Sequence, residues 1–229
     1  MGKLIEDRSL RDKFFVFKDR KEAGMLLSKS LSGYKSTGSI VLAIPSGGVS
    51  VAVEIARALM LSLDVVIVRK IQIPFNPEAG FGAVEPDGKV IFNEELLRRL
   101  DLSEKEIERQ INKTKDIIKR RNEIFRKGQD FPSIKNRKVI IVDDGLATGY
   151  TMLAAIDFVK RLEPQKIVVA VPTGSEKTVD TILTQVDELL CLNVRSRYTF
   201  AVAEAYENWY DLEDEEVISL LNNFYIVEE

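Results

Sequence analysis

Histidine is absent from this chain of 229 residues, and cysteine occurs once, as Cys191. Without histidine, Ser-His-Asp triads, Cys-His pairs and the usual zinc sites are excluded. A single cysteine excludes an intrachain disulfide, and the leucines around it predict a buried side chain rather than a nucleophile. Any metal ion must therefore be held by oxygen, which is the preference of Mg²⁺.

Long apolar runs are also missing, and so is the apolar stretch of an export signal at the start of the chain. Hydrophobic residues make up 45% of the sequence and charged residues 30%, as in an ordinary folded domain with additions. The net charge of −3 gives no general attraction to nucleic acid or to an anionic membrane. These features predict a cytoplasmic protein without a membrane partner.

The sequence is organised around the stretch from Lys138 to Thr151, which reads KVIIVDDGLATGYT. The apolar run at 139–142 predicts a strand buried on both faces of a parallel sheet. Asp143 and Asp144 follow where this strand ends, and small or hydroxyl residues come next, before apolar residues resume at helical spacing. The predicted order is therefore strand, acidic pair, glycine loop and helix.

This order suits the recognition of a phosphorylated ribose. Backbone N–H groups at a helix N-terminus point at one small volume and carry the positive end of the helix dipole, so a phosphate fits there. Gly149 allows the backbone to come close, and the hydroxyls of Thr148 and Thr151 add donors. Asp143 and Asp144 are suitable acceptors for ribose hydroxyls. The alternative is an acidic strand end followed by an ordinary helix cap.

A second unit of the same kind comes earlier in the chain. The apolar run at 40–44 predicts a buried strand, and Ser46, Gly47 and Gly48 follow it before a helix. Adjacent glycines at a strand end allow backbone amides to turn inward and hold an anion. A tight turn is the alternative for so short a pattern, and the later motif favours the anion site.

A third buried strand is expected at 63–68, and it ends in Arg69 and Lys70, two cations that can serve the same anion or lie in solvent. Residues 71–88 contain three prolines and three glycines and show neither the helical nor the strand period. Such a stretch predicts a structureless lid over an active site. Glu78 and Glu85 are its candidates for moving a proton, and the sequence does not choose between them.

Capping boxes mark the starts of two predicted helices, one at Asp19 with Glu22 and one at Ser103 with Glu106. The second opens the main helix of a region, 93–127, that is rich in lysine and arginine. Because acids are interleaved with these bases, a solvated helix face is expected there, and RNA contact is the alternative.

The C-terminal half predicts two more buried strands, at 166–171 and 189–194. Residues 172–175 lie between a strand and a helix, as the other loops do, and are expected to line the same edge of the sheet. The tail beyond residue 195 loses the alternation of strand and helix. It gathers aromatic side chains instead, among them Tyr206, Trp209 and Tyr210.

The run VIIVDDGLATGYT resembles the signature of the type I phosphoribosyltransferases, in which a strand, two acids and a small-Thr-Gly-x-Thr loop hold phosphoribosyl pyrophosphate. This resemblance implies that Asp143 and Asp144 hold the ribose hydroxyls, with Mg²⁺ bound through those hydroxyls or through water. Ala147 stands where hypoxanthine-guanine members carry an aspartate, so the loop is closer to the adenine type. The residues implied around the 5-phosphate are Ala147, Thr148, Gly149, Tyr150 and Thr151, and Gly145 is a further candidate for binding the substrate.

The resemblance also assigns the earlier loop. In the family the loop matching Ser46, Gly47 and Gly48 binds the pyrophosphate, often with a strained non-proline peptide. Arg69 and Lys70 would then face the departing pyrophosphate. The implied fold is a doubly wound, mainly parallel α/β sheet forming one domain over 1–229, and homodimers are common in this family.

Both ends of the chain resemble a subgroup whose acceptor is unassigned. They are expected to form a small cap over the acceptor, from about 1–32 and 195–229, around a core at about 33–194. In this cap Arg20 is a candidate for reaching a phosphate. Tyr206, Trp209 or Tyr210 are candidates for stacking on a planar base, and core packing or a dimer interface explains them equally well.

The predicted reaction is transfer of the 5-phosphoribosyl group from Mg²⁺-bound phosphoribosyl pyrophosphate to a nitrogen acceptor, a nucleobase with a purine slightly favoured. The alternative on the same fold is a non-catalytic sensor of phosphoribosyl pyrophosphate that binds RNA through the basic helical region. A dehydrogenase is disfavoured, because no G-x-G-x-x-G motif follows the first strand.

Overall fold

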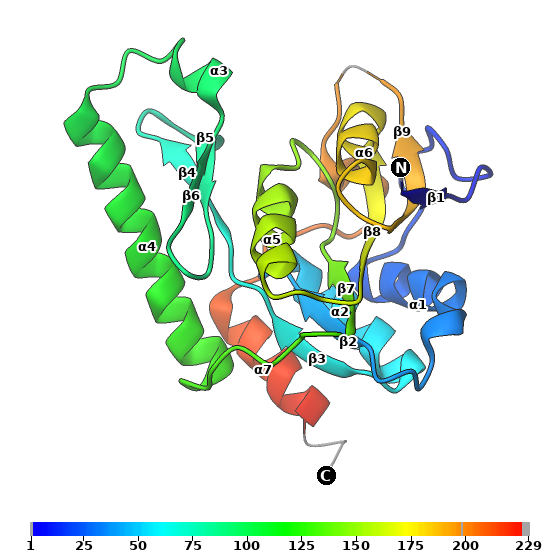
Figure 1. Cartoon of the computed structure of the whole chain (residues 1–229). Coiled ribbons are helices and arrows are strands. Elements are labelled where there is room, and N and C mark those ends of the chain that lie inside the picture. Colours follow the sequence, from blue (N-terminus) through cyan, green and yellow to red (C-terminus); the bar gives the residue numbers. More distant parts are fainter. Residues whose placement is uncertain (1, 198, 226–229) are drawn as a thin grey trace.

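The computed structural model describes residues 2–197 and 199–225, apart from the side chains of residues 77 and 78. A six-stranded sheet runs through its centre, and every neighbouring pair of strands is parallel (Figure 1). Their order across the sheet is β1 (Lys3–Ile5), β9 (Glu188–Arg195), β8 (Lys166–Ser175), β7 (Lys138–Val142), β2 (Ile40–Ala43) and β3 (Ser62–Val65). The predicted mainly parallel α/β sheet is confirmed.

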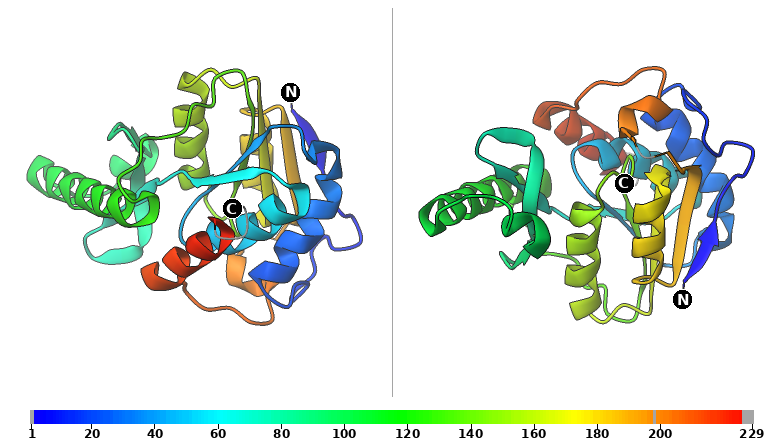
Figure 2. Two further views of the ribbon diagram at one scale, coloured as in Figure 1. Left: turned by 90° about the horizontal axis from the view of Figure 1, so that it is seen from below. Right: turned by 90° about the horizontal axis from the view of Figure 1, so that it is seen from above.

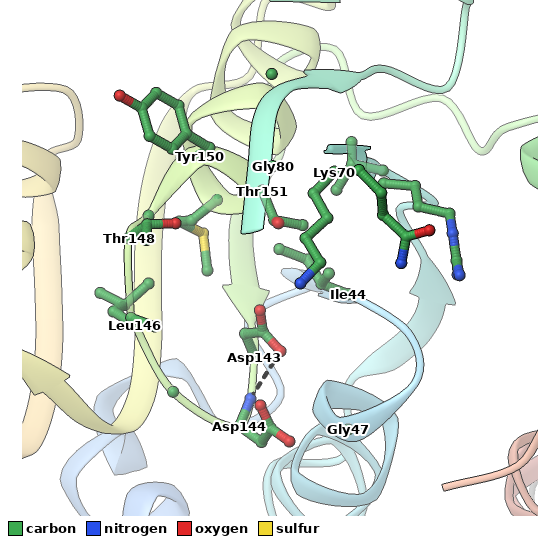
Figure 3. Close-up of a pocket in the computed structure, with 18 of the residues that line it drawn as sticks. Ile44, Gly47, Lys70, Gly80, Asp143, Asp144, Leu146, Thr148, Tyr150 and Thr151 are labelled. Carbon is green, nitrogen blue, oxygen red and sulfur yellow. Dashed lines mark hydrogen bonds between the residues drawn. The ribbon is translucent and has the colours of Figure 1, made fainter. Parts of the chain in front are cut away.

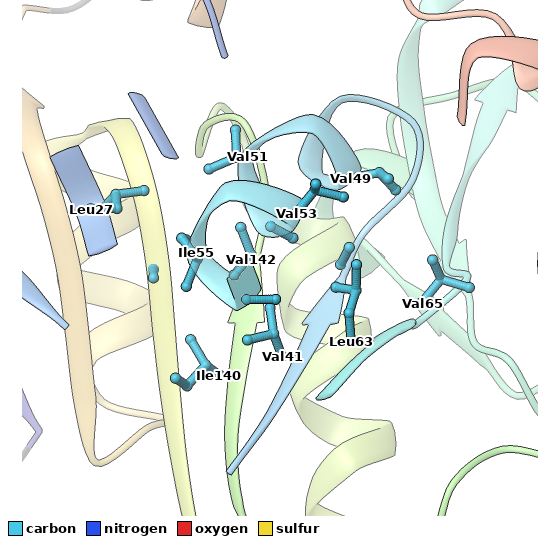
Figure 4. Packing of buried hydrophobic residues seen from close by; sticks show 14 of the residues in the cluster. Leu27, Val41, Val49, Val51, Val53, Ile55, Leu63, Val65, Ile140 and Val142 are labelled. Atoms are coloured by element: carbon cyan, nitrogen blue, oxygen red, sulfur yellow. The ribbon is translucent and has the colours of Figure 1, made fainter. Parts of the chain in front are cut away.

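Helices cover both faces of this sheet, which is the doubly wound arrangement (Figure 2). Side chains alternate along each strand, so Val41 and Ile140 join one hydrophobic cluster while Leu42 and Ile141 join the other. Figure 4 shows the first cluster beneath α2. The first face carries α1 (Arg20–Ser30), α2 (Gly47–Leu59) and α7 (Asp214–Tyr225), and the second carries α5 (Tyr150–Arg161) and α6 (Glu176–Leu183).

A second sheet, antiparallel and three-stranded, stands beside the core together with two helices (Figures 1 and 2). We call residues 69–126 the side lobe. The chain enters it after β3 and returns from it to β7. Its elements are β4 (Arg69–Ile73), β5 (Asn76–Val84), β6 (Val90–Phe92), α3 (Glu94–Leu97) and α4 (Glu104–Arg126).

The prediction of a structureless lid at 71–88 is therefore wrong, because most of this segment is a β-hairpin. Ile71 and Ile73 are buried while Gln72 between them is half-buried, which is a strand alternation too short to stand out. Gly82 permits the pairing with β6, since a Cβ there would lie 2.5 Å from the carbonyl oxygen of Ile91. Two of the glycines that suggested a loop, Gly80 and Gly82, thus belong to β5, and Gly88 lies in the turn that follows it.

Other boundaries are close to those expected. The box of Ser103 and Glu106 opens α4, and the Asp19 side chain accepts from the Glu22 amide at the start of α1. The third strand ends at Val65 rather than at residue 68. Residues 172–175 continue β8 instead of forming a loop, because β9 pairs with them as far as Arg195.

The two ends of the chain lie together, as Phe17 bridges Tyr206 and the amide of Phe15 donates to the carbonyl oxygen of Glu204 at 2.9 Å. Their predicted role as a cap over the acceptor stays a prediction, and so does the division into core and cap. Two short 3₁₀ helices, η1 (Ser32–Tyr34) and η2 (Val202–Ala205), complete the fold. Within residues 2–197 and 199–225, no helix combines the length and the apolar character that crossing a membrane requires.

Candidate functional site

A cavity of about 590 Å³ lies at the carboxyl ends of β2 and β7, where the side lobe faces the core. Ligands of open α/β sheets bind at this edge. Figure 3 shows Asp143 after β7, Thr151 of α5 and Lys70 of β4 around the same space. The sequence-predicted residues that line the cavity are Ser46, Gly47, Arg69, Lys70, Asp143, Asp144, Gly145, Ala147, Thr148, Gly149, Tyr150 and Thr151.

The acidic pair lies at the end of β7, and the Asp144 amide donates to Oδ1 of Asp143 at 2.9 Å. Burial raises the pKa of Asp143 well above its ordinary value, and the neighbouring carboxylate of Asp144 raises it further. Burial also raises the pKa of Asp144, although Arg20 opposes the change. Two acids in such surroundings favour a partner that supplies positive charge or hydroxyl donors.

Arg20 occupies one side of Asp144. Its side chain is only 6% exposed, and its Nε donates to Oδ2 of Asp144 at 2.8 Å. Nη1 donates to the carbonyl oxygen of Tyr210 at 2.8 Å, and the guanidinium carbon lies 3.9 Å from the ring centroid of Trp209. Arg20 does not line the cavity, and its guanidinium positions Asp144, so a contact of Arg20 with a phosphate stays a prediction.

The aromatic side chains of the tail form the wall behind this pair. Tyr206 is 1% exposed, and its hydroxyl donates to the carbonyl oxygen of Asp144 at 2.7 Å. Trp209 packs on Arg20 and on Tyr206, with 5.3 Å between the two ring centroids. Neither these two nor the exposed Tyr210 lines the cavity. Packing explains Tyr206 and Trp209, Tyr210 is exposed, and base stacking by any of the three stays a prediction.

The first glycine loop comes close to the acidic pair. A Cβ at Gly47 would lie 1.8 Å from Oδ2 of Asp144, and one at Gly48 would lie 2.7 Å from the carbonyl oxygen of Val142. Gly48 does not line the cavity, and its amide donates to the carbonyl oxygen of Ile44 at 3.1 Å. The peptide between Pro45 and Ser46 is cis. The glycines thus permit two loops to meet, which the sequence pattern alone did not reveal.

The second glycine loop leads into α5, whose N-cap is Gly149 with φ of 79°. This positive φ favours glycine, no side chain caps the helix there, and Tyr150, Thr151 and Met152 of its first turn line the cavity. The loop is held from behind, because the Thr178 hydroxyl donates to the carbonyl oxygen of Ala147 at 2.6 Å. Residues 172–175 therefore support the loop instead of lining the cavity, as Leu146 bridges Gly174.

Cations from the side lobe form the opposite wall. Arg69 and Lys70 open β4, and Arg121 of α4 reaches the same cavity. Nη2 of Arg121 donates to Oγ of Ser46 at 3.2 Å. Burial lowers the pKa of Arg69, and the nearby Arg121 lowers it further.

Arg121 was missed by the sequence reasoning, which expected a solvated basic face on this helix. Its side chain is 14% exposed, and Arg126 on the same helix is 4% exposed beside Asp64. Helical spacing could have predicted that Arg121 faces inward, since it lies on the same face of α4 as the buried Ile118 and Phe125.

Of the two proton-transfer candidates, Glu85 does not line the cavity. Glu85 is fully buried, and its Oε2 accepts from Nη2 of Arg161, a pair that ties the side lobe to α5. Burial raises the pKa of Glu85, and Arg161 opposes the change. The side chain of Glu78 lies outside the described residues.

The donor set of the site suits Mg²⁺ only in part. Within the described ranges, no group of three or more acidic, histidine or cysteine side chains can hold a metal ion. Asp143 and Asp144 offer oxygen atoms, which Mg²⁺ prefers, and Mg²⁺ commonly completes its shell with water and substrate phosphates. The residues present therefore fit a metal ion that arrives with a phosphorylated substrate.

An open α/β sheet with an acidic pair, an uncapped helix N-terminus and a basic wall at one edge has the features that suit a phosphorylated ligand. The family model of the phosphoribosyl transferase domain matches residues 20–209. The chain belongs to this family, which confirms the resemblance seen in the acidic motif.

Two relatives show how far the similarity extends. The chain is 37% identical over 207 residues to "Putative phosphoribosyl transferase Rv0571c" of Mycobacterium tuberculosis strain H37Rv, covering 90% of this chain and 46% of that protein. It thus spans about half the length of the curated relatives it matches. The crystal structure of TT1426 from Thermus thermophilus is similar with a TM-score of 0.72 and 36% identity, over 91% of this chain and 98% of that one.

Proposed function

We propose that the chain transfers the 5-phosphoribosyl group from Mg²⁺-bound phosphoribosyl pyrophosphate to a nitrogen acceptor. The acceptor is a nucleobase, with a purine favoured over a pyrimidine, and pyrophosphate is released. One observation carries this proposal, namely that the half-buried acidic pair, the N-terminus of α5 and three cations surround a single cavity. The family supports the same reaction class.

In this reaction the bond from C1 of the ribose to the pyrophosphate oxygen breaks, and its electron pair leaves with the pyrophosphate. The acceptor nitrogen forms the new bond to C1 and gives up a proton. Charge develops on the ribose ring as in glycoside hydrolysis, so the protein needs no nucleophile. Its contribution is to position the two reactants and to stabilise the separating charges.

Each side of the cavity has a part in this scheme. Asp143 and Asp144 accept hydrogen bonds from the ribose hydroxyls, and the amides after Gly149 hold the 5-phosphate. Arg69 and Lys70 stabilise the departing pyrophosphate. Asp143 and Asp144 would hold Mg²⁺ through the ribose hydroxyls or water, and the metal ion would there offset part of the phosphate charge. The side lobe limits the access of water, which competes with the acceptor.

The sensing and RNA-binding alternative finds less support. Arg121 and Arg126 turn inward and are paired with acids, so the basic helix offers fewer charges to a nucleic acid than its sequence suggests. A homodimer and a cytoplasmic location are part of the proposal, in line with the common state of the family.

The test is pyrophosphate release from Mg²⁺-bound phosphoribosyl pyrophosphate across a panel of purine and pyrimidine bases. Asp144→Asn should lower kcat by ~10²-fold or more, the scale of losing one preorganised electrostatic contact. Release that depends on one base and is lost in the variant supports the transferase. A variant within a few-fold of the wild type removes this role from Asp144, and a wild type that binds the donor without any release supports a sensor.

A further inference from the structure

Arg121 lines the cavity although no signature motif marks it. It comes from α4 in the side lobe, more than 50 positions after Arg69. Nη2 donates to Oδ1 of Asp214 at 2.7 Å and to Oγ of Ser46 at 3.2 Å. Its Nε is buried and has no hydrogen-bond partner in the described part of the chain. The side chain is therefore held in place with part of its donor capacity unused.

The wall around Arg121 gathers positive charge. Arg69, Lys70 and Arg121 line the cavity, and the proximity of Arg121 adds to burial in lowering the pKa of Arg69. Asp214 is the carboxylate bonded to Arg121, and it is shared with Arg120, whose Nη2 lies 2.6 Å from Oδ2. Because like charges at a buried wall repel one another, an anionic ligand in the cavity would reduce this repulsion.

The position of Arg121 indicates which of the two glycine loops it serves in binding an anion. The hydroxyl that it contacts belongs to Ser46, on the loop that precedes α2 and not on the loop that precedes α5. These two loops line the cavity from adjacent strands, β2 and β7. A phosphate at the α5 loop is served by helix amides, whereas a phosphate beside Ser46 has the guanidinium of Arg121 next to it.

On the basis of the proposed function, we propose that Arg121 binds the pyrophosphate of the donor and that Asp214, at the first residue of α7, positions it there. Arg121 would act as a substrate-binding residue contributed by the side lobe, and Asp214 as a positioning residue that acts through it. The C-terminal helix would thereby influence donor binding without reaching the cavity.

Two ligands and two arginines make the test specific. Phosphoribosyl pyrophosphate and ribose 5-phosphate differ only in the pyrophosphate, so their affinities in the presence of Mg²⁺ separate the two phosphate sites. Arg120→Met is the matched control for Arg121→Met, because both arginines are bonded to Asp214 and only Arg121 lines the cavity. Isothermal titration calorimetry gives the affinities, and thermal unfolding shows whether each variant remains folded.

Arg121→Met should weaken the affinity for phosphoribosyl pyrophosphate by about 10- to 100-fold, which is the effect of losing one hydrogen bond to a charged group. The affinity for ribose 5-phosphate should stay within about twofold of the wild type. Arg121→Lys should recover part of the loss, and Arg120→Met should change neither ligand by more than about twofold. Equal effects of the two methionine variants, or an equal loss of both ligands, would overturn the role of Arg121. A wild type that binds neither ligand would refute the proposed function itself.

Discussion

Replacing Gly47 with alanine should disturb the acidic pair without touching either acid. The new Cβ would lie 1.8 Å from Oδ2 and 2.5 Å from Cγ of Asp144. The carboxylate must retreat by roughly 1.5 Å to restore an ordinary contact. Its bond to Nε of Arg20, now 2.8 Å long, would then exceed hydrogen-bond distance.

The expected cost follows from these contacts. Overpacking a well-packed site costs about 1–3 kcal/mol, and weakening a buried ion pair adds to it. We expect Gly47→Ala to lower the free energy of unfolding by about 1–3 kcal/mol, with a decrease in Tm of about 2–4 °C for each kcal/mol. Gly33→Ala is the control, because a Cβ there meets nothing within 4 Å.

A double-mutant cycle with Asp144→Ala tests the mechanism. Because Asp144→Ala removes the atoms that clash, Gly47→Ala should cost little in that background. Denaturant unfolding of the four proteins gives the coupling free energy. If the two substitutions are additive within about 0.5 kcal/mol, Gly47 does not act through Asp144 and the argument from close approach fails.

Three further predictions concern buried groups. Burial raises the pKa of Asp143 above its ordinary value of 3.8, so its contribution to stability is present below that pH and is lost as the pH rises through the raised pKa. The Tm of Asp143→Asn should therefore increase relative to that of the wild type as the pH rises from about 4 to 8. A difference in Tm that stays constant over this range would contradict the prediction. Among the described residues, Arg161→Met leaves the buried Glu85 with only Lys89, whose Nζ lies 4.0 Å from its Oε1, as a cationic neighbour. This substitution should cost about 1–3 kcal/mol in urea unfolding, less than for a fully buried pair because the guanidinium of Arg161 is 36% exposed. Adding Glu85→Gln should recover part of the loss. Cys191 is fully buried and burial raises the pKa of its thiol, so a thiol reagent should modify it only on unfolding, and rapid labelling of the native protein would show that β9 opens.

The sequence predicted those parts of the site that depend on local order. A strand, two acids and a glycine loop follow one another in 138–151, and a strand followed by Ser46 and Gly47 obeys the same rule, so topology alone brings them to one edge. Arg69 and Lys70 followed from the end of the next strand. These predictions needed no knowledge of distant contacts.

The missed or misplaced residues depend on contacts between segments far apart in the chain. Arg20 and Asp144 are 124 positions apart, and Arg121 meets Asp214 across 93 positions. Composition cannot show that a basic residue in a charged helix faces inward. The hairpin at 69–84 was missed because its glycines serve close pairing with neighbouring strands, which looks like a loop in one dimension.

These distant contacts give the cavity its polarity. On the core side, Arg20 is paired with Asp144, so the carboxyl group of Asp143 remains for hydroxyl donors or a cation. On the lobe side, Asp214 is bonded to Arg121 and to Arg120 and so offsets only part of the positive charge. The molecule that suits both walls carries hydroxyls at one position and several phosphate charges at another. Phosphoribosyl pyrophosphate has this distribution. Each wall depends on a residue from another helix, Arg20 of α1 or Asp214 of α7. Substitutions of these residues should therefore alter the binding of the donor at milder changes than are needed to disturb the sheet.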